Sequence, residues 1–99
     1  MAFINQRLYF RVTYLEPGNY FPAIESFVYV GKNLSDEDEE DTWYFQPSAD
    51  YSLKGSILES SGGDRPVVCA NAKDAAFMLD ADGLKAEIEA AQRRWAERA

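Results

Sequence analysis

Hydrophobic and polar side chains alternate along the first part of the chain with the two-residue period of a β-strand. Residues 6–15 place apolar or aromatic side chains at every even position from 8 to 14, and a mixed set at the odd positions. Pro17 and Gly18 follow and predict a turn, because Pro fixes φ and Gly tolerates positive φ. We therefore expect a second strand at residues 24–31, antiparallel to the first.

An aromatic run at residues 42–46 predicts the third strand. Trp43, Tyr44 and Phe45 favour extended backbone, and their rings must lose most of their contact with water when the chain folds. Pro47 follows directly and cannot donate a hydrogen bond to a neighbouring strand, so the strand is expected to end there.

The middle of the chain is compatible with more than one structure. Residues 54–59 fit either a strand or a helix, and Gly55, which disfavours a helix by about 1 kcal/mol, makes a short strand the preferred prediction. Residues 60–64 are rich in Ser and Gly and predict a turn. Residues 65–69 then predict a last strand, in which Pro66 is tolerated near the start.

The C-terminal part has the signature of helices. Asn71 is a favourable N-cap, and Asp74 stands three residues later, as in a capping box, so a short helix is expected at 72–79. A final helix is expected at 83–98, because apolar side chains recur there at helical spacing. This stripe consists of Leu84, Ile88, Ala91 and Trp95.

Strands that precede helices in this order indicate an α+β fold. We expect one small domain over residues 1–99, with an antiparallel sheet of four to five strands at about 6–70 and helices at about 72–98. Short connections favour a meander, and the apolar stripe of the last helix predicts that the C-terminal helices cover one face of the sheet.

Composition excludes several classes of protein. The 46% hydrophobic content and fourteen aromatic residues of this 99-residue chain argue against disorder. A net charge of −7 disfavours direct binding to nucleic acid and to anionic membranes. The single Cys69 cannot form an internal disulfide, and no apolar run resembles a signal peptide or a membrane span, so a cytoplasmic protein is expected.

The chain lacks the residues on which most catalysis depends. It has no histidine, which removes the commonest general base and zinc ligand, so we expect no enzyme, no catalytic residue and no cofactor. Cys69 is expected to be a small buried residue of a strand. The run Asp36-x-Asp38-x-Glu40 resembles half of an EF-hand loop, but Asp41 stands where Gly is required and Pro47 replaces the last ligand, so no metal site is expected.

Six consecutive acids precede the aromatic strand, and their mutual repulsion predicts a solvated loop. Removing these six charges from the net −7 leaves −1, so the acidity of the chain is mostly that of one loop. The candidate partner-binding residues are the acids with the two aromatic residues behind them: Asp36, Glu37, Asp38, Glu39, Glu40, Asp41, Trp43 and Tyr44.

Two functions follow from this loop. The first is a non-catalytic binding protein of the inhibitor, immunity or regulatory type, which engages a basic protein surface, such as that of a nucleic-acid-binding protein. The alternative is a small-ligand-binding or homodimeric structural module, in which the acidic loop only aids solubility. The pattern alone leaves both open.

Overall fold

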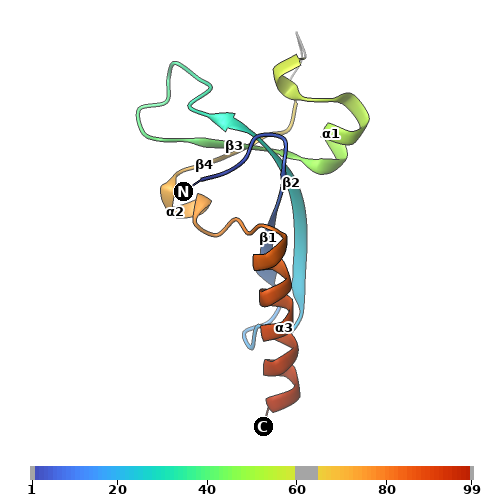
Figure 1. Ribbon diagram of the computed structural model, residues 1–99. Helices are drawn as coiled ribbons and strands as arrows, with labels where there is room; N and C mark the ends of the chain where they lie inside the picture. The colour runs from blue at the N-terminus through green and yellow to red at the C-terminus, as the bar shows by residue number, and fades with distance from the viewer. Residues whose placement is uncertain (1, 60–64, 99) are drawn as a thin grey trace.

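The protein forms an antiparallel meander sheet packed with helices, which confirms the expected α+β fold (Figure 1). The structure is a computed structural model that describes residues 2–59 and 65–98. Within these residues one sheet has the strand order β1-β2-β3-β4. Its strands are β1 (Leu8–Tyr14), β2 (Pro22–Lys32), β3 (Trp43–Pro47) and β4 (Val68–Ala70).

Strands β1 and β2 form a long hairpin, as the alternating pattern predicted. Leu8 pairs with Val28 at one end, and Tyr14 pairs with Pro22 at the other. The predicted turn between them is confirmed: the carboxylate of Glu16 accepts hydrogen bonds from the backbone N–H groups of Tyr20 and Phe21. These bonds satisfy backbone donors that would otherwise have no partner in the turn.

The hairpin extends well beyond the rest of the sheet. Strand β3 pairs with β2 only from Phe27 to Lys32, so the other half of β2 has β1 as its single neighbour. Helix α3 (Ala81–Glu97) lies along this free part of the hairpin (Figure 1). We call α3 and residues 10–26 the tail, and the remaining elements the head; together they make a molecule of 53 × 30 × 22 Å.

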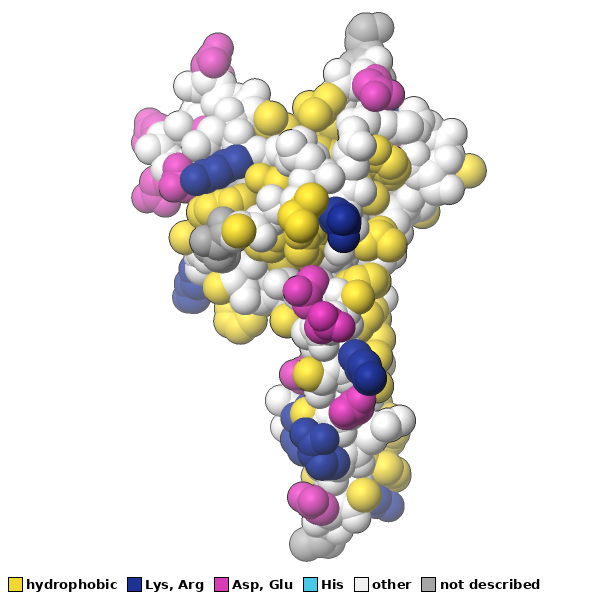
Figure 2. All heavy atoms as spheres, in the orientation of Figure 1, with side chains coloured by type: hydrophobic (Ala, Val, Ile, Leu, Met, Phe, Trp, Pro, Cys, Tyr) yellow, Lys and Arg dark blue, Asp and Glu magenta, His cyan; other side chains and the backbone are white. Residues whose placement is uncertain are grey.

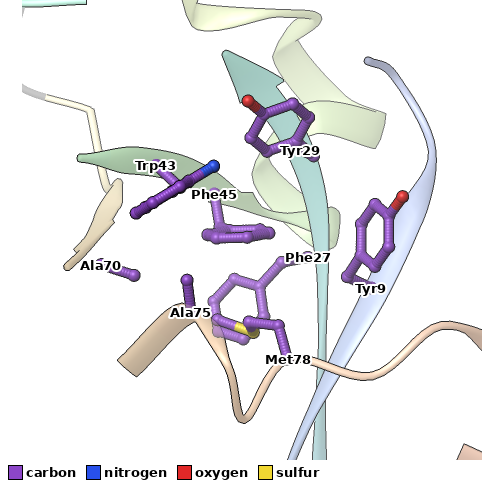
Figure 3. Close-up of a cluster of buried hydrophobic side chains, with 8 residues drawn as sticks. All are labelled: Tyr9, Phe27, Tyr29, Trp43, Phe45, Ala70, Ala75 and Met78. Atoms are coloured by element: carbon purple, nitrogen blue, oxygen red, sulfur yellow. The ribbon is translucent and has the colours of Figure 1, made fainter. Parts of the chain in front are cut away.

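The hydrophobic core lies in the head, on one face of the sheet. Alternate residues of the strands point to the same face, which brings their rings together under the short helix α2 (Ala72–Ala75) (Figure 3). The buried cluster consists of Tyr9, Phe27, Tyr29, Trp43, Phe45, Ala70, Ala75 and Met78. Phe3 completes it from the N-terminal segment, with its ring at right angles to that of Phe45 and 5.1 Å away, a favourable arrangement of aromatic quadrupoles.

The preferred strand at residues 54–59 is wrong. Helix α1 (Ser48–Lys54) and the 3-10 helix η1 (Ile57–Glu59) occupy this part of the chain, and β3 pairs directly with β4. The predicted turn at 60–64 lies outside the described residues. The domain therefore has a helical segment within the range that was expected to be all sheet.

A buried side chain explains this helical segment. Gln46, at 0% exposure, donates to the carbonyl of Gly55 at 3.0 Å and accepts from the backbone N–H of Ile57 at 3.0 Å. Arg65 donates to the carboxylate of Asp50 and to the same Gly55 carbonyl, at 2.9 and 2.7 Å. These bonds satisfy backbone groups that a strand would have paired with a neighbour. Gly55 itself ends α1 with a positive φ of 77°.

Helix α2 begins where its cap predicted, but it is shorter than expected, and helix α3 begins earlier than expected. The side chain of Asn71 accepts from the backbone N–H of Asp74, as expected. Helix α2 ends early because Leu79 forms a β-bridge with Phe10, with backbone hydrogen bonds of 2.8 and 2.9 Å. Helix α3 starts two residues before the predicted position, since Asp80 acts as its N-cap and accepts from Gly83.

Gln46→Leu should destabilise the protein by about 1–3 kcal/mol, because a leucine of similar size leaves the N–H of Ile57 without its partner. Urea unfolding followed by tryptophan fluorescence measures the difference. Ser52→Ala, on the exposed side of α1, is the control and should change the free energy of unfolding by less than about 0.5 kcal/mol. Equal stability of the two variants would contradict the role of Gln46.

Candidate functional site

The acidic run occupies the loop that joins β2 to β3, at the end of the head (Figure 1). Its carboxylates gather on the lobe that this loop forms, at the upper left of the surface view (Figure 2). We call residues 33–42 the acidic loop. The predicted solvated loop is confirmed, since Asp36, Glu37, Glu39, Glu40 and Asp41 are exposed.

The neck of the acidic loop is closed by hydrogen bonds. The backbone N–H of Asn33 donates to the carbonyl of Thr42 at 2.7 Å, and the N–H of Thr42 donates to the Asn33 side chain at 2.8 Å. Asn33 adopts a φ of 54°, a left-handed conformation that asparagine tolerates better than most residues. The loop thus leaves and rejoins the sheet at a fixed point.

Asp41 is bound to the neck as well. Its carboxylate accepts from the side-chain amide of Asn33 at 3.1 Å and lies 3.3 Å from the ammonium group of Lys32. The hydrogen bond from Asn33 and the charge of Lys32 lower the pKa of Asp41 below its ordinary value. The same ammonium lies 4.9 Å from the centre of the Trp43 ring, a cation–π distance.

Asp38 points back toward the sheet instead of into solvent. Its carboxylate accepts from the hydroxyl of Tyr44 at 2.6 Å and from the backbone N–H of Ser35 at 3.2 Å. The hydrogen bond to Asp38, with burial and the negative charge as further causes, raises the pKa of Tyr44 to about 12. Tyr44 therefore stays neutral and holds the middle of the loop near β3.

The four remaining acids have a different environment. Within the described residues, no hydrogen bond or ion pair involves the carboxylates of Asp36, Glu37, Glu39 or Glu40. Internal bonds thus fix two acids of the run, while four face solvent from a short loop of closed geometry. Such an arrangement concentrates negative charge and leaves it available to a cationic group.

The two aromatic residues proposed for the site lie inside the protein. Trp43 is only 5% exposed and packs in the core cluster, and Tyr44 is 9% exposed with its hydroxyl bound to Asp38. They hold the acidic loop from within, so the surface offered to a partner consists of carboxylates. Sequence reasoning missed Lys32 and Asn33, although an Asn just before a loop is a common signal for a left-handed turn.

Other candidate chemistry does not assemble into a site. In residues 2–59 and 65–98, no group of three or more His, Cys, Asp or Glu side chains is placed to hold a metal ion. In the same residues, no helix has the length and apolar character needed to cross a membrane. Cys69 belongs to β4 but is exposed, which corrects the expectation that its side chain is buried.

Asp38→Asn should lower the pKa of Tyr44 from about 12 toward the ordinary value of 10.0, because the amide cannot stabilise the neutral phenol as a carboxylate does. NMR titration of ring-labelled tyrosine, with Tyr44→Phe to assign the signal, measures the shift. The matched control is Asp36→Asn, which removes a solvent-facing carboxylate and should leave this pKa unchanged.

The same hydrogen bond predicts a pH dependence of stability. Since the folded-state pKa of Tyr44 lies above its unfolded value of 10.0, the contribution is complete below pH 10 and is lost as the pH rises toward 12. Wild type should therefore lose stability over this range more steeply than Tyr44→Phe. Parallel losses in the two proteins would contradict the assignment.

Comparison with known proteins identifies no relative of this chain. No protein-family model, no curated protein and no solved structure matches the chain. The function must therefore be argued from the residues and contacts of this chain.

Proposed function

We propose that this chain is a non-catalytic binding protein that engages a basic surface of another protein through its acidic loop. One observation supports this above the others: internal bonds hold Asp38 and Asp41, while the carboxylates of Asp36, Glu37, Glu39 and Glu40 face solvent. Cationic side chains of a partner would pair with these four carboxylates, and the fixed neck would set the direction of approach.

The loop geometry reduces the cost of binding. A flexible acidic segment loses conformational entropy when a partner orders it, whereas the bonds at Asn33 and Asp38 already restrict this loop. Preorganised charge also accelerates association, because a concentrated negative patch steers a positive surface during encounter. Both effects favour a recognition site over a purely solubilising loop.

The chemistry of the patch suggests the class of partner. The four carboxylates share their negative charge with a phosphate backbone, although their spacing differs. Lys and Arg side chains that bind phosphate also bind carboxylate. A nucleic-acid-binding protein has such a surface. An inhibitor, immunity or regulatory role would then follow from occupation of that surface.

The alternative of a ligand-binding or homodimeric module is supported by a different part of the molecule. An apolar groove of about 360 Å³, lined by Phe21, Ile88 and Trp95 among others, opens in the tail on the side away from the acidic loop. In this alternative the acidic loop aids solubility only. Experiment can distinguish the two proposals, because they assign the binding surface to opposite ends of the molecule.

The test compares the binding of one partner to wild type, to a variant that lacks charges in the acidic loop, and to a variant that lacks the same number of charges elsewhere. The loop variant is Glu37→Gln, Glu39→Gln and Glu40→Gln, and each change keeps the size of the side chain. A protein captured from host lysate by wild type is purified, and its affinity is measured at low and high salt. The loop variant should bind at least about 10-fold more weakly, and high salt should weaken wild-type binding, because salt screens exposed charges.

A charge-matched control distinguishes the loop from net charge. Glu25→Gln, Glu59→Gln and Asp74→Asn remove the same number of charges from exposed positions elsewhere. This control should bind the purified partner within about 2-fold of wild type, since separated surface charges contribute little. Equal weakening by both variants, or by neither, would leave the acidic loop without a recognition role.

A further inference from the structure

The outer edge of β1 is paired at one residue. In an antiparallel strand, successive residues point their backbone N–H and carbonyl groups alternately to one side and the other. Tyr29 of β2 donates to the carbonyl of Arg7 at 3.1 Å, so the odd-numbered residues of β1 face β2. Phe10 points the opposite way and exchanges bonds of 2.8 and 2.9 Å with Leu79. The even-numbered residues of β1 therefore turn their backbone groups away from the sheet.

Two of these residues, Val12 and Tyr14, have free backbone groups. Tyr14 lies opposite Pro22 in the β1–β2 pair, and Pro22 has no N–H to donate, as expected for a pair that exchanges no hydrogen bonds. Within the described residues, no backbone hydrogen bond involves the outward N–H and carbonyl groups of Val12 or Tyr14. They form a short row of donors and acceptors, which is a template for another strand.

The protein's own chain leaves this part of the edge open. Leu79 pairs with Phe10 in antiparallel direction, so a longer pairing would place Phe77 opposite Val12. The N–H of Phe77 instead donates to the carbonyl of Asp74 at 3.1 Å, in the turn that ends α2. The chain thus follows β1 for one residue, and the positions opposite Val12 and Tyr14 are left to another chain.

A groove of about 260 Å³ lies along this free edge, at the junction of the head and the tail. Three successive residues of β1 and three of β4 line it, and successive side chains of a strand point to opposite faces. The groove is therefore bordered by the edges of these two outer strands and not by one face of the sheet. In Figure 3, Ala70 of β4 and Tyr9 of β1 lie on opposite sides of the buried cluster, with Met78 between them. The lining consists of Arg11, Val12, Thr13, Val68, Cys69, Ala70, Asp74, Phe77 and Met78.

The lining combines an exposed apolar ring with a free negative charge. Phe77 is 69% exposed, so its ring is available to an apolar side chain. The guanidinium of Arg11 already pairs with Glu25 at 2.9 Å. Within the described residues, no hydrogen bond or ion pair involves the carboxylate of Asp74. The groove therefore favours a segment that carries an apolar and a cationic side chain, and the net charge of −7 has the same effect.

We propose that the edge of β1 at Val12 and Tyr14 is a strand-addition site for an extended, basic and apolar segment of another protein. The segment pairs with β1 as a further strand of the sheet, through the free backbone groups of these two residues. An apolar side chain of the segment contacts Phe77, and a Lys or Arg pairs with Asp74. The inference is independent of the acidic loop, because no residue of 33–42 lines the groove.

Amide hydrogen exchange of the free protein tests whether the edge is open. The N–H groups of Val12 and Tyr14 should exchange at least about 10-fold faster than that of Phe10, although all three belong to the same strand. Slow exchange at Val12 in the free protein would show that this chain or a second copy already covers the edge, and it would overturn the proposal.

A set of short peptides tests the occupant. Each peptide is acetylated and amidated, with a lysine at both ends and central positions that vary among Val, Ile and Thr, which favour extended backbone. The peptide that binds most tightly should slow amide exchange at Val12 and Tyr14. Methylation of its backbone nitrogens should weaken binding at least about 10-fold at alternate positions and about 2-fold or less at the positions between them, because successive N–H groups of a strand point to opposite sides.

Variants of the protein test the same contacts. Val12→Pro removes one outward N–H and should weaken peptide binding at least about 10-fold, while the fold is retained because Pro is tolerated where the N–H of an edge strand faces solvent. Val12→Ala keeps the N–H and should have a smaller effect, about 3-fold or less. Asp74→Asn should weaken binding about 3-fold at low salt. Asp36→Asn is the matched control for charge and should stay within about 2-fold of wild type. Circular dichroism verifies that each variant is folded.

The remaining outcomes would each overturn the proposal. If no peptide of the set binds, the edge has no affinity for an extended segment. If backbone methylation weakens binding equally at every position, or at none, the peptide occupies an apolar groove without pairing to β1. These peptide measurements use wild-type protein, so they decide the question even if Val12→Pro does not fold.

Discussion

The unequal pairing of β2 determines the shape of this protein. The strand has eleven residues and spans about 36 Å, but β3 pairs with only its second half, from Phe27 to Lys32. That half belongs to a packed core, while the first half has only β1 beside it and depends on α3 for cover. An isolated two-stranded ribbon is marginally stable, and Tyr14 connects β1 to α3 through hydrogen bonds with Glu87 and Arg94.

The same strand separates the two surfaces that bear on function. The acidic loop follows the C-terminal end of β2, and the aromatic cluster of Tyr20, Phe21 and Trp95 lies where β2 begins. The separation is several Debye lengths at physiological salt, where one Debye length is about 8 Å. The negative charge of the acidic loop therefore has little effect on the electrostatics of the tail.

Local patterns in the sequence predicted the elements that depend on local physics. Alternation predicted the hairpin, and the cap at Asn71 was predictable because it involves a backbone N–H group only three residues away. Helix α1 was not predicted because it depends on contacts between residues that are separated in the sequence. In the sequence Gln46 is one more residue of a strand, whereas in the structure its amide bonds the carbonyl of Gly55 and the N–H of Ile57. In the acidic loop the run of charge was visible, but the inward turn of Asp38 depends on Tyr44, and the burial of Trp43 depends on the whole core.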